Sequence, residues 1–147
     1  MLVGIRHAGK SYLLYQRAMQ FIEQGHNIKE LVYINFDDER LLGMTAEDFD
    51  LILQAYNSMY SYKPILFFDE IQNIDGWEHF ARRLANQKYM VYITGSNAKM
   101  LSRDIATTLG ARFFDEKVYP YSFREYIEAQ GVELGEGWMY GKKKKPF

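Results

Sequence analysis

Short apolar runs alternate along the chain with longer segments in which apolar residues recur every three or four positions. The short runs predict strands at Leu2–Val3, Leu31–Phe36, Ile65–Phe68, Tyr89–Ile93 and Phe113–Val118. The periodic segments predict helices that begin near Lys10, Thr45, Gly76 and Phe123. Strands that alternate with helices indicate an α/β fold, with a mostly parallel sheet of about five strands flanked by helices.

The composition fits a single domain. The chain has 147 residues, 48% of them hydrophobic and 25% charged, which is enough to bury a core. Cysteine is absent, which excludes disulfides, thiolate metal sites and cysteine nucleophiles. The longest purely apolar run, Ile65–Phe68, is far shorter than the roughly 20 residues that span a bilayer. We therefore expect a cytoplasmic protein with no membrane partner.

Charge divides the chain into a core and a tail. Residues 142–145 are four successive lysines, and without them the net charge of −1 would be −5. We expect 1–130 to be the core, with a shortened first strand, and 131–147 to be a linker or flexible basic tail. The short strand and the glycine-rich end also predict that a further C-terminal domain is missing. An acidic core is a poor surface for nucleic acid, so a nucleic-acid partner would need a basic surface from elsewhere.

The segment between the first strand and the first helix has the pattern G-x-x-x-x-G-K-S/T. Its glycines let the backbone wrap closely around a phosphate, and the helix that follows directs its positive end at the same place. Lys10 would reach the β- and γ-phosphates, and the Ser11 hydroxyl would bind Mg²⁺. The alternative is a glycine turn followed by a solvated lysine. The predicted nucleotide-binding residues are Gly4, Ile5, Arg6, His7, Ala8, Gly9, Lys10, Ser11 and Tyr12.

A second motif is the acidic pair that ends the strand Ile65–Phe68. Asp69 would hold Mg²⁺, directly or through water, and Glu70 would orient and polarise an attacking water. Many strands end in an acid at a turn, so this pair alone is weak evidence. It indicates a catalytic site only together with the phosphate loop earlier in the chain. Asp37 and Arg40, which follow the second strand, are expected to be solvated, although their position would let either approach the site.

Two further candidates follow the fourth predicted strand. Ser96 or Asn97 would hydrogen-bond the γ-phosphate or the attacking water, although Asn97 would equally serve as a helix cap. Arg112 would neutralise charge that develops at the γ-phosphate, often across a subunit boundary, with Arg103 as the competing candidate. A lone arginine in this place is otherwise a surface residue. His7, His26 and His79 lack the spacing of metal ligands.

With these motifs the chain resembles the prokaryotic AAA+-type P-loop ATPases, in which the ATPase core is usually followed by a C-terminal domain of unknown function. The resemblance is carried by the loop at Gly4–Ser11 and by the segments Tyr33–Arg40, Phe68–Gln72, Thr94–Asn97 and Val118–Tyr126. It implies a three-layer P-loop NTPase fold of the AAA+ kind.

The resemblance also implies roles for single residues. Lys10 and Ser11 would be the Walker A residues, Asp69 and Glu70 the Walker B pair, and Ser96 or Asn97 the sensor. Arg112 corresponds to the family's arginine after the sensor, which would act in trans within a homo-oligomer. The chain departs from the family at Ile5, His7 and Ala111, where proline, arginine and glycine are usual.

These observations predict Mg²⁺-dependent binding and hydrolysis of ATP, coupled to an unidentified partner or C-terminal domain, with Lys10, Glu70 and Arg112 as catalytic residues. The alternative is a nucleotide-binding switch or interaction module with negligible hydrolysis. A small-molecule phosphotransferase is a third reading, but the Asp-Glu pair favours an activated water over a second substrate.

Overall fold

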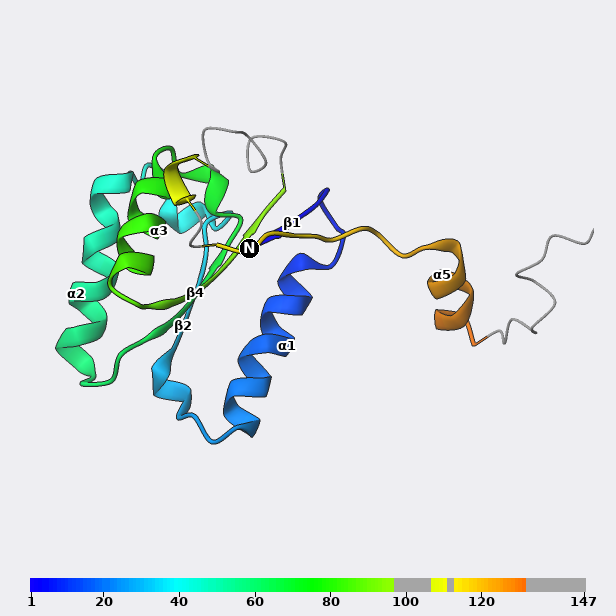
Figure 1. Ribbon diagram of the computed structural model, residues 1–147, viewed down its shortest axis with the longest axis horizontal. Helices are drawn as coiled ribbons and strands as arrows, with labels where there is room; N and C mark the ends of the chain where they lie inside the picture. The colour runs from blue at the N-terminus through cyan, green and yellow to red at the C-terminus, as the bar shows by residue number, and fades with distance from the viewer. Residues whose placement is uncertain (97–106, 111–112, 132–147) are drawn as a thin grey trace, which may run out of the picture.

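Five parallel strands form the centre of the molecule. The computed structural model describes residues 1–96, 107–110 and 113–131. The strands lie in the order β2-β3-β4-β1-β5 (Figure 1). Their bounds are Leu2–Val3 for β1, Leu31–Asn35 for β2, Ile65–Asp69 for β3, Met90–Gly95 for β4 and Glu116–Lys117 for β5. The expected α/β fold with a parallel sheet is confirmed.

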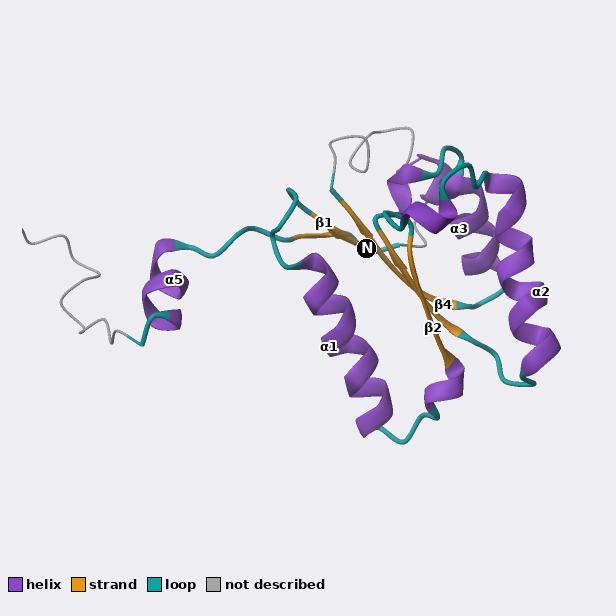
Figure 2. Cartoon of the chain, turned by 180° about the vertical axis from the view of Figure 1, so that it is seen from behind, coloured by secondary structure: helices purple, strands orange, loops and turns teal. Residues whose placement is uncertain are grey.

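The helices cover both faces of this sheet. Helix α1 (Lys10–Glu23) lies on one face, and α2 (Phe49–Met59) and α3 (Trp77–Asn86) lie on the other (Figure 2). The chain runs outward from β1 to β2 and then returns through β3 to β4. Crossovers between parallel strands share one hand, so connections in opposite directions place their helices on opposite faces.

Strand β3 is buried along its whole length and divides the core in two. Leu66 and Phe68 pack toward α2 and α3, where Phe49 and Phe80 stack with ring centroids 4.5 Å apart. Ile65 and Phe67 point the other way, toward Leu14 and Phe21 of α1. The continuous apolar run therefore reflects a strand covered on both faces, as its sequence predicts.

Most helix boundaries agree with the expected ones. Helix α1 begins at Lys10 and gives way to Gly25, whose φ of 93° stops the helix. Thr45 and Asp48 form the expected capping box, but they cap a 3₁₀ turn (Ala46–Asp48), and α2 begins only at Phe49. Three further 3₁₀ turns are η1 (Ile28–Glu30), η2 (Glu39–Leu41) and η4 (Ile71–Asn73).

Strand β5 is shorter than its sequence suggests. Only Glu116–Lys117 of the predicted Phe113–Val118 are paired, because the strand it pairs with, β1, itself has two residues. Strand β4 starts one residue later than predicted and continues to Gly95, and β2 stops before Phe36.

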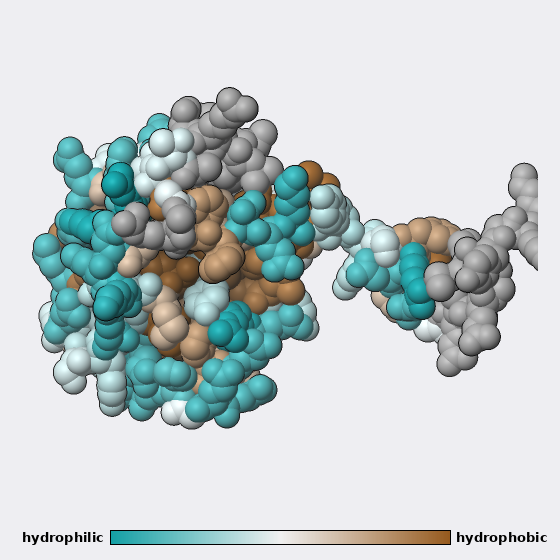
Figure 3. All heavy atoms as spheres, in the orientation of Figure 1, coloured by the Kyte–Doolittle hydropathy of each residue, from teal (hydrophilic) through white to brown (hydrophobic). Residues whose placement is uncertain are grey.

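Helix α5 (Phe123–Ala129) lies apart from the sheet and its flanking helices (Figure 1). Its first turn is closed by a capping box between Ser122 and Glu125. Figure 3 shows some hydrophobic surface on α5. The aromatic side chains Tyr119, Tyr121, Phe123 and Tyr126, on this helix and the segment before it, are 53% to 75% exposed. The predicted basic tail lies outside the described residues, apart from Gly131.

Gly4, which opens the loop after β1, is fitted closely against the exit of β5. A Cβ at this position would lie 2.1 Å from the backbone oxygen of Val118, which is held in place by the 2.7 Å hydrogen bond from Val118 N to the Val3 oxygen. We expect Gly4→Ala to lower the free energy of unfolding by about 2–3 kcal/mol, because the backbone must move. Urea unfolding measures this change.

Gly9→Ala is the matched comparison for that experiment. Gly9 has a φ of 89°, but a Cβ there would meet nothing within 4 Å, so only the backbone strain of about 1 kcal/mol applies. Equal destabilisation by the two substitutions would contradict the contact between Gly4 and β5.

Candidate functional site

Three polar segments meet at one edge of the sheet because they follow strands that lie side by side. The loop 4–9 follows β1, Glu70 follows β3, and Ser96 follows β4, which lies between the other two. The pairs Val3↔Gly95 and Phe68↔Ile93 set these strands in register, so that their carboxyl ends coincide. Ligands of open α/β sheets bind at this edge.

The loop has the backbone geometry of an anion site. His7 and Gly9 adopt positive φ angles of 62° and 89°, and the N–H of Ala8 donates to the Ile5 oxygen at 3.3 Å. Gly9 caps α1 without a side-chain hydrogen bond, and the first turn of α1 contains no acid. Gly9 thus leaves the amino end of α1 without a side-chain cap, and the partial positive charge of this helix end favours an anion.

Lys10 joins this loop to the acidic strand. Its side chain is 3% exposed, and Nζ donates to the Ile5 oxygen at 2.9 Å. The same Nζ lies 3.4 Å from Oε1 of Glu70, whose side chain is 14% exposed. A buried ion pair of this kind keeps the two charges in place, because each would be costly to bury alone. The structure thus brings together the lysine and the glutamate that the sequence singled out separately.

Asp69 is buried and held at both oxygens. The Tyr33 hydroxyl donates to Oδ2 at 2.7 Å, and the Thr94 hydroxyl donates to Oδ1. Tyr15, on α1, donates in turn to the Tyr33 oxygen at 3.0 Å. Partial burial and the hydrogen bonds with Tyr15 and Asp69 raise the pKa of Tyr33 well above its ordinary value, so it remains a donor. A carboxylate oxygen can accept more than one bond, so Asp69 keeps capacity for a metal ion.

Thr94 also fixes the turn that carries Glu70. Glu70 adopts the left-handed conformation with φ 52° and ψ 43°, which is strained for a residue with a side chain. Its N–H donates to the Thr94 hydroxyl oxygen at 3.0 Å. One buried hydroxyl therefore orients Asp69 and stabilises the unusual backbone of Glu70.

Ser96 completes the described part of the site. Nε2 of Gln72 donates to the Ser96 hydroxyl oxygen at 3.2 Å and to Oε2 of Glu70 at 2.7 Å. The other two residues predicted on this side, Asn97 and Arg112, and the competing candidate Arg103 lie outside the described residues. Ser11 and Asp69 each neighbour one member of the Lys10–Glu70 pair in sequence, and a metal shared between them stays a prediction.

The segment after β2 also reaches the loop. NH2 of Arg6 lies 3.1 Å from both carboxylate oxygens of Asp37, which also accepts from Nδ2 of Asn73 at 3.3 Å. Arg40 instead pairs with its neighbour Asp38. Asp37 and Arg40 are the two residues after β2 that the sequence placed near the site. Of these two, Asp37 is the one that contacts the loop. The Arg6–Asp37 pair is exposed and therefore adds little to stability.

Three residues of the site were missed by the sequence analysis: Tyr33, Thr94 and Gln72. Tyr33, Asp69 and Thr94 lie on one face of the sheet, because β2, β3 and β4 are in parallel register. Side chains two positions apart share a face. With the strand order known, this alternation would have identified Thr94 and Tyr33 as neighbours of Asp69.

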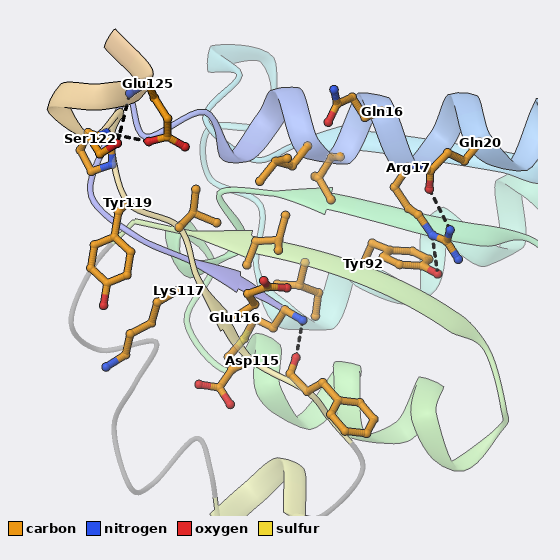
Figure 4. A pocket seen from close by; sticks show the side chains of 18 residues that line it. Gln16, Arg17, Gln20, Tyr92, Asp115, Glu116, Lys117, Tyr119, Ser122 and Glu125 are labelled. Carbon is orange, nitrogen blue, oxygen red and sulfur yellow. Dashed lines mark hydrogen bonds between the residues drawn. The ribbon is translucent and has the colours of Figure 1, made fainter. Parts of the chain in front are cut away.

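A hollow in the described surface lies elsewhere, between α1 and the segment that contains β5 (Figure 4). Its lining includes Arg17, which donates to the Tyr92 hydroxyl oxygen at 3.2 Å, and the Ser122–Glu125 cap. Lys10, Asp69 and Glu70 are not among its lining residues. In the described part of the chain, no three His, Asp or Glu side chains gather as a metal site by themselves.

The chain belongs to the AAA domain family, which it matches over residues 1–127. This match and the parallel sheet with its phosphate loop define an AAA-type P-loop ATPase fold, as the motifs predict. Among the described residues, no helix is long and apolar enough to cross a membrane.

Similar proteins are found in an archaeon and a bacterium. The chain is 38% identical over 134 residues to an uncharacterized protein of Methanocaldococcus jannaschii, covering 91% of this chain and 29% of that protein. It is 34% identical over 135 residues to an uncharacterized protein of Haemophilus influenzae, covering 90% of this chain and 34% of that protein. The chain therefore spans about a third of the length of these relatives.

Proposed function

We propose that this chain binds ATP with Mg²⁺ and hydrolyses the γ-phosphate with Glu70 as general base. The observation that carries the proposal is the 3.4 Å contact between Nζ of Lys10 and Oε1 of Glu70. It places the cation that would face the terminal phosphates beside the carboxylate that would activate the water, within a largely buried site. Glycine loops followed by a lysine and a distant acidic strand serve this purpose in phosphoryl transfer.

The residues present fit such a ligand. Loop 4–9 and the open amino end of α1 supply N–H donors for phosphate oxygens, and Lys10 supplies a positive charge. The Ser11 hydroxyl and the Asp69 carboxylate would hold Mg²⁺, which proteins usually bind with few side chains beside the substrate phosphates. When bound, Mg²⁺·ATP supplies the phosphoryl group and the metal charge that offsets its oxygens. Glu70 would orient the attacking water and take up its proton.

The proposal extends to partners through the family likeness alone. Arg112 would reach the γ-phosphate of a neighbouring copy in a homo-oligomer, and Ser96 or Asn97 would contact the γ-phosphate within the chain. A C-terminal domain would couple hydrolysis to its target, and nucleic acid would require a basic surface on that domain. The net charge of −1 hides an acidic core, as the four lysines lie in residues 142–145.

A second candidate function is a nucleotide-binding switch with negligible turnover. The observation that favours it is that both oxygens of Glu70 are engaged, Oε1 by Lys10 and Oε2 by Gln72. If Glu70 kept both contacts with nucleotide bound, it would not be available to activate water.

The direct test of binding is calorimetric titration of ATP into the purified chain, with Mg²⁺ and with EDTA. We expect saturable binding that weakens when Mg²⁺ is removed, because Ser11 and Asp69 then lose their shared ion. AMP, which lacks the β- and γ-phosphates, is the matched ligand and should bind more weakly. Equal affinities for ATP and AMP would contradict a loop that holds the terminal phosphates.

A further inference from the structure

The two polar atoms of the Gln72 side-chain amide are unequally hydrogen-bonded. In the described part of the chain, its Oε1 is the buried side-chain polar atom that has no hydrogen-bond partner. The other amide atom, Nε2, makes two hydrogen bonds, to Oε2 of Glu70 at 2.7 Å and to Oγ of Ser96 at 3.2 Å. Burying an unpaired carbonyl oxygen costs about 1–3 kcal/mol, so the amide is held in this orientation against a cost.

The acceptors around Gln72 determine this orientation. An ionised carboxylate only accepts hydrogen bonds, so the amide nitrogen of Gln72 has to face Glu70. Rotating the amide by half a turn would place its oxygen against a carboxylate oxygen and lose the bond to Glu70. Since the Ser96 oxygen accepts from Gln72, the Ser96 O–H is still able to donate toward the edge of the sheet.

The backbone that carries Gln72 is rigidly held. Gln72 is the middle residue of η4, between Ile71, which is fully buried, and Asn73. Nδ2 of Asn73 donates to the Phe36 oxygen at 3.1 Å, and the N–H of Ile74 donates to the Ile71 oxygen at 3.0 Å. The turn is thereby attached to the core and to the end of β2, and the Gln72 amide has a fixed base from which to hold Glu70.

We propose that Gln72 is the positioning residue of Glu70, with Ser96 as its second anchor. The inference rests on the proposed function, because it assigns to Gln72 the orientation of the general base. Among the described residues, Glu70 has two side-chain partners, Lys10 and Gln72. Lys10 has a competing task at the phosphates, whereas Gln72 does not. The contact from Gln72 is the one that keeps the carboxylate oriented when Lys10 turns to the nucleotide.

Kinetics of Gln72→Met and Gln72→Glu test the proposal. Met keeps the length of the side chain without its donors, and Glu keeps the shape but places an acceptor against Glu70. We expect kcat for phosphate release to fall by about 10²-fold in Gln72→Met, as for other small misplacements of a reacting group, and further in Gln72→Glu. KM and the dissociation constant of ATP should stay within about twofold, because Gln72 faces Glu70 and not the loop.

The matched control is Gln54→Met, on the exposed side of α2, which should leave kcat, KM and the melting temperature unchanged. A Gln72→Met variant that folds and releases phosphate at the parent rate would overturn the role of Gln72 while leaving the proposed function standing. Parallel losses of ATP affinity, turnover and melting temperature would show a merely structural role and would also overturn it. A parent chain without Glu70-dependent phosphate release would instead overturn the proposed function.

An NMR experiment tests the contacts of Gln72 with Glu70 and Ser96 independently of turnover. The side-chain amide of Gln72 is assigned in a ¹H–¹⁵N spectrum by its disappearance in Gln72→Met. We expect Glu70→Gln to shift one of its two protons and Ser96→Ala to shift the other. If neither proton moves in either variant, Gln72 does not bridge the two residues and the proposal fails.

Discussion

Phosphate release by the Glu70→Gln variant is expected to fall by about 10²- to 10⁴-fold, the range for loss of a general base. Glutamine keeps the size of the side chain, and the backbone bond from residue 70 to Thr94 is retained. What is lost is the negative charge that takes up a proton and that pairs with Lys10 at 3.4 Å. Removal of this charge releases Lys10 toward the phosphates, so ATP should bind at least as tightly as in the parent.

Steady-state phosphate release and ATP titration on the same preparations measure the two effects. Glu47→Gln, an exposed change of the same kind on the turn before α2, is the control and should retain the parent rate. Equal rates in parent and Glu70→Gln, both at background, would remove hydrolysis from the proposal and leave the nucleotide-binding switch. Equal rates well above background would show that another group activates the water.

Lys10→Ala is expected to weaken ATP binding by about 10²-fold. A hydrogen bond to a charged group contributes roughly 1.5–3 kcal/mol, and the substitution removes it from the terminal phosphates. It also leaves the Glu70 carboxylate without its cationic partner, next to where the phosphates would lie, which adds repulsion. The double variant Lys10→Ala and Glu70→Gln should therefore recover part of the lost affinity.

Calorimetry with ATP and Mg²⁺ measures both variants. The control Lys63→Ala removes a lysine charge just before β3 begins, at the amino ends of the strands and away from the site. Nζ of Lys63 donates to the Gln87 oxygen at 2.8 Å. This control should bind ATP as the parent does. If Lys10→Ala folds and binds ATP with unchanged affinity, the nucleotide does not lie in this loop.

Much of the fold follows from local pattern. The start of α1 at Lys10, the stop at Gly25 and the start of α3 after Gly76 are set by glycines and apolar spacing, which a sequence displays directly. The length of β5 is not local, because it depends on how many residues its neighbour β1 offers for pairing. The delayed start of α2 depends on a 3₁₀ turn whose capping box resembles that of an α-helix.

The residues of the candidate site also fall into those that local sequence predicts and those that depend on neighbouring strands. Asp69, Glu70 and Ser96 are recognisable because each stands at or next to a strand end. Lys10 is recognisable by its place in the glycine-rich loop pattern, and the structure brings Lys10 and Glu70 into contact. Thr94 and Tyr33 act on Asp69 from neighbouring strands, so their roles depend on strand order and register. Gln72 depends on the left-handed turn at Glu70, which no pattern of residue types predicts for a glutamate.

The contact between Gly4 and Val118 has a consequence for how the chain transmits displacement. The first residue of the loop lies against the backbone that leads out of β5 toward α5, with no side chain between them. Two backbones in such contact have no compressible layer to absorb a shift. A shift of the backbone at Val118 would thus reach the opening of the loop directly, undiminished by rotamer changes.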